Sequence, residues 1–226
     1  MTEATTDPAG PHARPRRNNP RGQGERLREE LIDAASALVA DAGTASRLSI
    51  RAVAARVGVA ATSVYLHFAD LDELKVAVGE RCFAELAAAR DAAVAGIEDA
   101  AASLLARCQA YASFAIAHPG YYRLMFGPEL PPAVFTQAYD AEGSVSRNNY
   151  DQLIQAIHRC QQTGAARNDS DPALVGALLW PALHGQVSLR IDRPNFPRPP
   201  LEQVIAQTVT RLVGLKAPHG GHDLHS

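Results

Sequence analysis

Residues 48–74 read LSIRAVAARVGVAATSVYLHFADLDEL, and this stretch decides the fold that we expect for the N-terminal part of the chain. Ser49 is placed to cap a short helix that Gly58 ends. One face of this helix is apolar and carries Ile50, Val53, Ala54 and Val57. A second short helix opens at Ala60 or Ala61, after a turn of about four residues with one glycine, and runs through Val64 and Tyr65 to Phe68. Such a pair is typical of a helix-turn-helix, whose second helix enters the major groove of DNA.

The sequence on both sides of this stretch keeps a helical period. Upstream, apolar residues between Glu25 and Val39 recur at spacings of three and four, and Gly43 follows as a stop signal. Downstream, a long helix begins near Asp70 and runs toward Ala93. Its apolar residues are expected to pack against two different cores, one at each end of the helix. The first part of this helix can close the small helix-turn-helix core, so we predict a domain boundary along it.

The rest of the chain predicts further helices, separated by glycine and proline. They are expected at 98–118, 121–126, 135–162, 172–191 and 201–213. Pro119 and Gly120 end the first of them, and Pro181 predicts a kink inside the fourth. Together with the alanine-rich composition, this pattern predicts an all-α protein.

Composition and motifs exclude several classes of function. Twenty-two Lys and Arg against 24 Asp and Glu give a net charge of -2, which excludes a uniformly basic nucleic-acid coat. The sequence has no apolar stretch that would span a bilayer and no secretory signal, so we expect a cytoplasmic protein. Cys82, Cys108 and Cys160 are far apart and are expected to be reduced, buried thiols. Because nucleophile, phosphate-loop and zinc motifs are all missing, we expect no enzyme, no cofactor and no metal site.

The two ends of the chain are polar and rich in proline or glycine. Residues 1–24 are expected to form a disordered basic arm, and residues 217–226 a disordered tail. The arginines between Arg14 and Arg28 are either a solvated run of charge or an arm that touches DNA phosphates or the minor groove. The tail carries three histidines, which are either solvated or a metal site without fixed geometry: His219, His222 and His225.

The segment from Arg26 to Leu74 resembles the DNA-binding domain of TetR-family transcriptional regulators. Four elements carry the resemblance because they fall together at the family's spacing. They are Ala-Gly at 42–43, Gly-Val at 58–59, Tyr-x-His-Phe at 65–68 and Glu-Leu at 73–74. The resemblance implies an N-terminal three-helix DNA-binding domain at 25–74, followed by a helical domain at 75–216.

The resemblance also implies which residues face DNA. They are Ser49, Arg51, Ala61, Thr62, Ser63, Tyr65, Leu66 and His67. Hydroxyls of the recognition helix can bond base edges, and a methyl from Ala61 or Thr62 can meet a thymine methyl. Tyr65 and His67 match family positions that contact phosphates. Ser49 and Arg51 match positions that reach the DNA backbone or a neighbouring guanine.

Leu71 departs from the family pattern. Family members commonly carry a lysine at this position, where it holds a phosphate. Without that charge, the salt dependence of DNA binding should be shallower unless the arginines of the N-terminal arm compensate. The recognition helix is also poor in long charged side chains, so apolar contacts and DNA shape are expected to carry more of its specificity.

Two C-terminal motifs resemble the TetR domain type that is named for its Trp-His-Gly motif. They are HPGYYRLMFG at 118–127 and LLWPALHGQVSL at 178–189. Trp180 and His184 lie four residues apart, so they share one face of a helix. They are either a packing pair, in the core or at a dimer interface, or His184 hydrogen-bonds a ligand. Gly185 is expected to let another helix approach closely.

In this family the C-terminal domain binds an inducer and forms a homodimer. Carried over, the dimer interface falls on residues 172–190 and 201–215. The candidate pocket residues are mostly aromatic, and such a set is either a ligand pocket or plain core. They are Phe83, Tyr111, Phe114, Tyr122, Met125, Phe126, Trp180 and His184.

The expected function is that of a repressor that a small-molecule inducer releases from a palindromic operator. Its partners would be double-stranded DNA, an unidentified small molecule and a second copy of the chain. The alternative is a helical ligand-binding dimer with altered or lost DNA binding, which Leu71 and the sparse recognition helix favour.

Overall fold

The computed structural model describes residues 23–216, so the predicted histidine tail and nearly all of the predicted arm lie outside it. Within this range the chain forms helices, and the β-structure is a single isolated bridge between Ala166 and Leu215. The helices are α1 (Gln23–Ala42), α2 (Ile50–Val57), α3 (Ala61–Val64), α4 (Leu71–Val94), α5 (Ala100–Ala117), α6 (Pro119–Phe126), α7 (Pro132–Asp140), α8 (Val145–Gln162), α9 (Pro172–Asp192) and α10 (Leu201–Val213). The all-α prediction is confirmed.

Local signals set the ends of the N-terminal helices. The Ser49 side chain accepts a hydrogen bond from the backbone N–H of Ala52, and Gly58 ends α2 in a left-handed conformation. Asp70 caps α4 by accepting from the N–H of Glu73 at 2.8 Å. The Glu73 carboxylate in turn accepts from the N–H of Ala69, the residue before the cap, in an arrangement similar to a capping box.

Three sequence expectations need correction. Helix α3 has only four residues, because the chain turns after Val64. Pro119 begins α6, since a proline at the first helical position lacks only an N–H that has no partner there. The helix expected at 135–162 is two helices, because Gly143 adopts a positive φ of 74° and Ser144 caps a new start.

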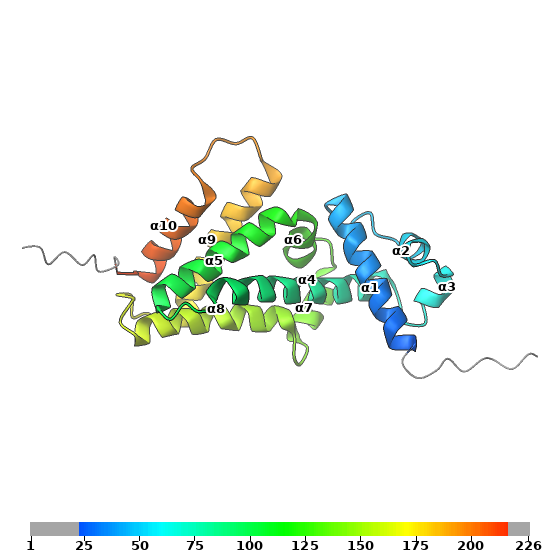
Figure 1. Ribbon diagram of the computed structural model, residues 1–226, viewed down its shortest axis with the longest axis horizontal. Coiled ribbons are helices and arrows are strands. Elements are labelled where there is room, and N and C mark those ends of the chain that lie inside the picture. Colours follow the sequence, from blue (N-terminus) through cyan, green and yellow to red (C-terminus); the bar gives the residue numbers. More distant parts are fainter. Residues whose placement is uncertain (1–22, 217–226) are drawn as a thin grey trace, which may run out of the picture.

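The buried side chains form two clusters, and Tyr111 of α5 and Phe126 of α6 pack against both. The first joins α1, α2 and α3 to α4 and α6, and the second joins α5, α8, α9 and α10. Figure 1 shows α1–α3 grouped at one end of an elongated molecule, with the α9–α10 pair toward the other end. The first cluster continues along α4 to Leu86, so the N-terminal unit is packed firmly on the rest of the chain. Across residues 23–216, no helix combines the length and apolar character needed to cross a membrane.

Candidate nucleic-acid interface and ligand cavity

The segment from α3 to the start of α4, residues 61–70, has some side chains buried in the core and others exposed to solvent. We call it the recognition segment. Val64 and Phe68 are buried and anchor the segment in the first core cluster. Tyr65 and Leu66 are 56% and 81% exposed, and Thr62 is also exposed. Burying Val64 and Phe68 therefore leaves the intervening residues free to meet a partner.

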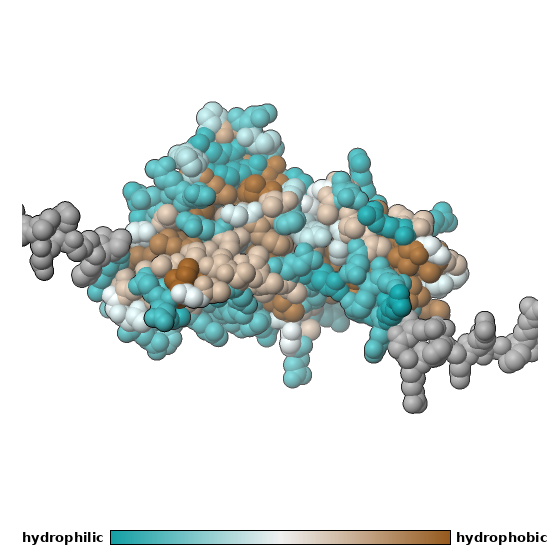
Figure 2. Space-filling model, viewed as in Figure 1, coloured by the Kyte–Doolittle hydropathy of each residue, from teal (hydrophilic) through white to brown (hydrophobic). Residues whose placement is uncertain are grey.

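The other residues expected to face DNA lie around this segment. Ser49 and Arg51 are exposed at the start of α2, and Ala61, Ser63 and His67 are partly exposed. Ser49 also caps α2, so its hydroxyl serves the helix as well as the surface. Apolar surface appears over α2 and α3 among hydrophilic residues (Figure 2).

A cavity of about 440 Å³ lies between helices α4 to α9. Its wall is mostly apolar and aromatic, with a few polar groups that come from α4, α5, α7 and α8. The lining residues are Phe83, Leu86, Arg90, Arg107, Cys108, Tyr111, Phe126, Phe135, Tyr139, Ser146, Asn149, Tyr150, Leu153, Ala177, Trp180, Pro181 and Leu183. This size and character suit a small organic molecule.

Half of the expected pocket residues line this cavity. Those on its wall are Phe83, Tyr111, Phe126 and Trp180. Those away from it are Phe114, Tyr122, Met125 and His184. Met125 of α6 is buried in the first core cluster, and Phe114 of α5 packs on His118 and Tyr121 instead of facing the cavity.

His184 sits in an aromatic cluster behind the cavity wall. Its ring stacks on Tyr122 and meets Trp180 edge to face, with ring centroids 5.1 and 4.7 Å apart. The Tyr122 hydroxyl lies 3.0 Å from His184 Nδ1, and the Tyr111 hydroxyl lies 3.3 Å from the same atom. Burial lowers the pKa of His184 and raises the pKa of Tyr122 to about 12, so both side chains are neutral near pH 7. The geometry agrees with the packing interpretation of the Trp180–His184 pair.

The expected role of Gly185 as a close-approach site is not found within residues 23–216. A Cβ atom added at this position would meet no neighbouring heavy atom of these residues within 4 Å. The close approach on α9 occurs instead at Gly176, where an added Cβ would lie 3.3 Å from Ile154 of α8.

Helix α6 and the loop after it connect the cavity to the N-terminal unit. A Cβ atom added at Gly120 would lie 2.4 Å from the carbonyl oxygen of Val39, so α6 packs directly on the α1 backbone. Arg123 Nη1 donates to the carbonyl of Gly43 at 2.8 Å, and its Nη2 lies 3.2 Å from the Asp192 carboxylate at the end of α9. One side chain thus joins α1 and α9.

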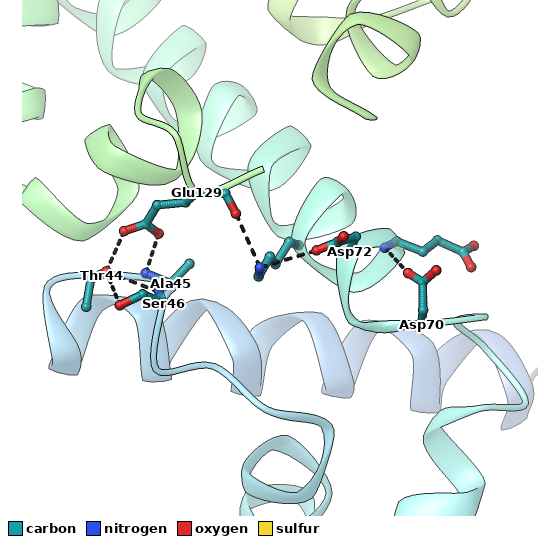
Figure 3. Close-up of polar contacts among 8 residues, drawn as sticks. Thr44, Ala45, Ser46, Asp70, Asp72 and Glu129 are labelled. Carbon is teal, nitrogen blue, oxygen red and sulfur yellow. Dashed lines mark hydrogen bonds and ion pairs between the residues drawn. The ribbon is translucent and has the colours of Figure 1, made fainter. Parts of the chain in front are cut away.

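Glu129 makes a second connection, in the loop between α6 and α7. Its carboxylate accepts hydrogen bonds from the Thr44 hydroxyl and the Ala45 N–H, in the turn that follows α1 (Figure 3). Its carbonyl oxygen accepts from Lys75 Nζ at 3.2 Å, and Lys75 also pairs with Asp72 of α4. The loop beside the cavity therefore holds both the turn before α2 and the first turn of α4.

Comparison with known families agrees with this arrangement of two units. The family described as bacterial regulatory proteins, tetR family, matches residues 31–78. The family described as tetracyclin repressor-like, C-terminal domain, matches residues 104–213. The chain belongs to the TetR family. Its Trp-His-Gly motif is consistent with the C-terminal match.

Individual TetR-family relatives are distant. A Haemophilus influenzae protein described as an uncharacterized HTH-type transcriptional regulator is 46% identical over 52 residues. That match covers 23% of this chain and spans only a quarter of the relative. Sequence similarity to this relative is therefore limited to a segment about the size of a DNA-binding domain.

Solved structures match over most of the chain. A Rhodococcus protein of unknown function has a TM-score of 0.63 at 24% identity and covers 90% of this chain and 99% of its own. PfmR, a TetR-family regulator from Thermus thermophilus, has a TM-score of 0.57 at 20% identity over 83% and 99%. RolR in complex with resorcinol has a TM-score of 0.61 at 17% identity over 86% and 90%. At these identities the likeness is one of fold.

The TetR-type lysine that Leu71 replaces has no direct substitute in the first turn of α4. Leu71 is partly buried and packs against the first core cluster. Lys75, one turn later, is held by Asp72 and by the Glu129 carbonyl. Position 71 therefore contributes a contact to the core and no charge.

Sequence reasoning missed the polar part of this TetR-type cavity. Arg90, Arg107 and Asn149 line it, together with Ser146 and Tyr150. In the sequence these residues look like the solvated side of an amphipathic helix. No short-range signal could reveal them, because the cavity forms only when α4, α5 and α8 pack together.

Proposed function

We propose that the chain is a DNA-binding transcriptional repressor that a small molecule releases from a palindromic operator. The observation that carries the proposal is the pairing, in one chain, of an exposed recognition segment with a cavity joined to it through α4 and α6. The helix-turn-helix geometry and the family of the chain both support it. Such a protein would meet its operator in the cytoplasm.

The recognition segment is suited to reading a groove by shape and apolar contact. Tyr65 and Leu66 project from it, while Thr62 and Ser63 offer hydroxyl groups beside them. Arg47 and Arg51 are exposed near the start of α2 and can approach phosphates. Phosphate contacts would then fix the orientation, and the recognition segment would select the sequence.

A second copy of the chain is proposed to pack on α9 and α10. Leu174, Leu178 and Leu189 are 55%, 57% and 57% exposed on α9, although a monomeric protein rarely leaves such a row of leucines uncovered. Ala177 and Pro181 are also exposed on α9 and line the cavity. A dimer through this face would bury the leucines, cover this edge of the cavity and present two recognition segments to a palindrome.

Release by a ligand would follow from the contacts of the cavity walls. Phe83 on α4 and Phe126 on α6 pack edge to face across the wall, with ring centroids 5.3 Å apart. A molecule that separates them displaces α4 or α6. Helix α6 carries the contacts to α1, and the loop that follows it holds the turn at Thr44–Ala45. Helix α4 continues directly from the recognition segment. A ligand that binds the displaced form better would lower the affinity for DNA. RolR was solved with resorcinol, which supports a small-molecule site in this fold.

The test is selection of DNA from a pool of random duplexes long enough to hold two half-sites one helical turn apart. Enriched duplexes are then compared with scrambled ones by fluorescence anisotropy at about 50 and 200 mM salt. We expect enrichment of an inverted repeat that keeps its advantage at the higher salt. Binding without enrichment, equal for all duplexes, would contradict the proposal and favour a ligand-binding dimer with altered DNA binding.

A further inference from the structure

Two guanidinium groups supply all the charge on the cavity wall. Arg90 of α4 and Arg107 of α5 line the cavity, and among the described lining residues there is no Asp, Glu, Lys or His. Burial raises the pKa of Tyr111 and raises the pKa of Cys108 to about 12, so both are uncharged near pH 7. The cavity therefore combines an apolar wall with a positively charged region.

Arg90 has neutral partners in spite of its burial. It is 6% exposed, and its two terminal nitrogens donate to the backbone and side-chain oxygens of Asn149 and to Gln152 Oε1. Its Nε is buried and has no hydrogen-bond partner among the described residues. Burial, with Arg107 nearby, lowers the pKa of Arg90 to about 10, so the group is still a cation at pH 7. Among the described residues Arg90 has no ion-pair partner, and Asp91, which pairs with Arg107, offsets its charge only from a distance. A buried cation normally has a direct counter-ion to offset its desolvation.

Arg107 does not neutralise this charge. Its Nη1 donates to Gln152 Oε1 at 3.0 Å, and its Nη2 lies 3.5 Å from the Asp91 carboxylate, whose side chain is 60% exposed. One carboxylate thus faces two guanidiniums. Glu80 lines a smaller neighbouring cavity, where it accepts the N–H of Val145 and where burial raises its pKa. The main cavity keeps a positive surplus.

We propose that the cavity binds an apolar organic acid, with its carboxylate against Arg90 and Arg107 and its apolar body against Phe83, Phe126 and Trp180. This rests on the proposed ligand-responsive function and names the class of ligand. A carboxylate supplies the missing counter-ion and accepts charge-assisted hydrogen bonds from guanidinium groups. A cationic ligand would be repelled here, and a neutral ligand would leave the buried charge without a counter-ion.

The test compares acids with their own primary amides, which keep the shape and remove the charge. The probes are biphenyl-4-carboxylate, 2-naphthoate and dodecanoate, each beside its amide. Binding to the full-length protein is measured by titration calorimetry and by the fluorescence of Trp180, the single tryptophan of the chain. We expect at least one acid to bind about tenfold or more tightly than its amide, as a charge-assisted hydrogen bond implies.

Variants locate the charge that is responsible. Arg90→Gln should remove the preference for the acid and leave the affinity for the amide within about twofold, since only the charge-assisted contact is lost. Arg90→Lys should restore part of the preference because it keeps the charge. Arg159→Gln is the matched control, since it removes a positive charge from an exposed position on α8. The comparison of acids and amides on the unmodified protein remains decisive if Arg90→Gln fails to fold.

Two results would overturn the inference: amides that bind as tightly as their acids, or no binding of any acid in the panel. If an amide binds the protein as tightly as its acid and dissociates the protein from DNA, the proposed ligand class is wrong but the ligand-responsive repressor is supported. An acid that binds at Trp180 of a protein that selects no DNA sequence would support the ligand class and refute the repressor.

Discussion

At the residue scale, the recognition segment separates side chains that hold the fold from side chains that are free. Val64 and Phe68 are fully buried, and Arg28 lies over the Phe68 ring with its guanidinium carbon 5.1 Å from the centroid. Tyr65 and Leu66, between them, are exposed. Substitutions at the exposed positions should therefore change DNA binding with little change in stability.

Leu66→Glu tests this separation. The side chain is 81% exposed, so the free energy of unfolding should change by about 0.5 kcal/mol or less. The new carboxylate would face DNA phosphates, so affinity for the selected duplex should fall about tenfold or more. Urea unfolding and anisotropy measure the two effects. Ala88→Glu, on α4, adds the same charge away from the recognition segment and should leave DNA affinity unchanged. Unchanged affinity in Leu66→Glu would remove this residue from the interface.

His184 makes a pH-dependent contribution to stability. Burial lowers its pKa in the folded chain, so the unfolded chain binds the proton more readily. The stabilisation is complete above the ordinary histidine pKa of about 6.5 and is lost as the pH falls below it toward the lowered value. The difference in unfolding free energy between the unmodified chain and His184→Gln should thus shrink between about pH 7.5 and pH 5.5. His158→Gln, at an exposed position, should show no such trend. A constant difference for His184→Gln would contradict the role of burial.

At the element scale, α6 is the helix that contacts the N-terminal unit, the cavity wall and the end of α9. It packs on α1 through Gly120, contributes Phe126 to the cavity wall and leads into the loop that carries Glu129. Arg123 adds the hydrogen bond to Gly43 and the ion pair with Asp192. A signal from the cavity to the DNA-binding unit has a short path through these contacts.

Gly120→Ala tests the contact between α6 and α1. The added methyl would lie 2.4 Å from the carbonyl oxygen of Val39, so α6 must move, at a cost of about 1–3 kcal/mol in unfolding free energy. Gly79→Ala is the control within α4, because its methyl would meet no atom of another described element within 4 Å and alanine favours a helix. Urea unfolding of both variants distinguishes them. Equal stabilities would mean that α6 and α1 are not in close contact.

The helices themselves were largely predictable from the sequence, because caps and stops such as Ser49, Gly58, Asp70 and Gly164 act locally. The division between α7 and α8 was missed because apolar residues keep their helical spacing across Gly143, whose positive φ breaks the helix. Of the residues that line the cavity, only aromatic ones were predicted from the sequence. The burial of Arg90 could not be predicted, because it depends on the packing of α8 against α4, which supplies Asn149.

At the scale of the whole molecule, the described chain is elongated (Figure 1). Leu174, Leu178 and Leu189 form an exposed apolar face on α9. Helix α9 lies away from α3 (Figure 1), so a dimer formed through α9 would leave both recognition segments open. The first core cluster links α1–α3 to α4 and α6, so each DNA-binding unit would move with its own cavity. Two such units related by a twofold axis would read a palindrome.

Leu178→Glu tests the dimer. A carboxylate in the middle of the exposed leucine row would be buried without a counter-ion on association, so the protein should become monomeric. Light scattering during size-exclusion chromatography measures the mass. Ala88→Glu again serves as the charge-matched control and should remain dimeric. If Leu178→Glu keeps the mass of the dimer, the interface lies elsewhere.

The most direct test of a link between the cavity and the DNA-binding surface is the affinity for the selected duplex with and without a saturating acid probe. We predict that the acid weakens DNA binding about fivefold or more, and that DNA weakens acid binding by the same factor, because the coupling between two sites is reciprocal. An acid that binds beside Trp180 and leaves the affinity for DNA unchanged would contradict the link.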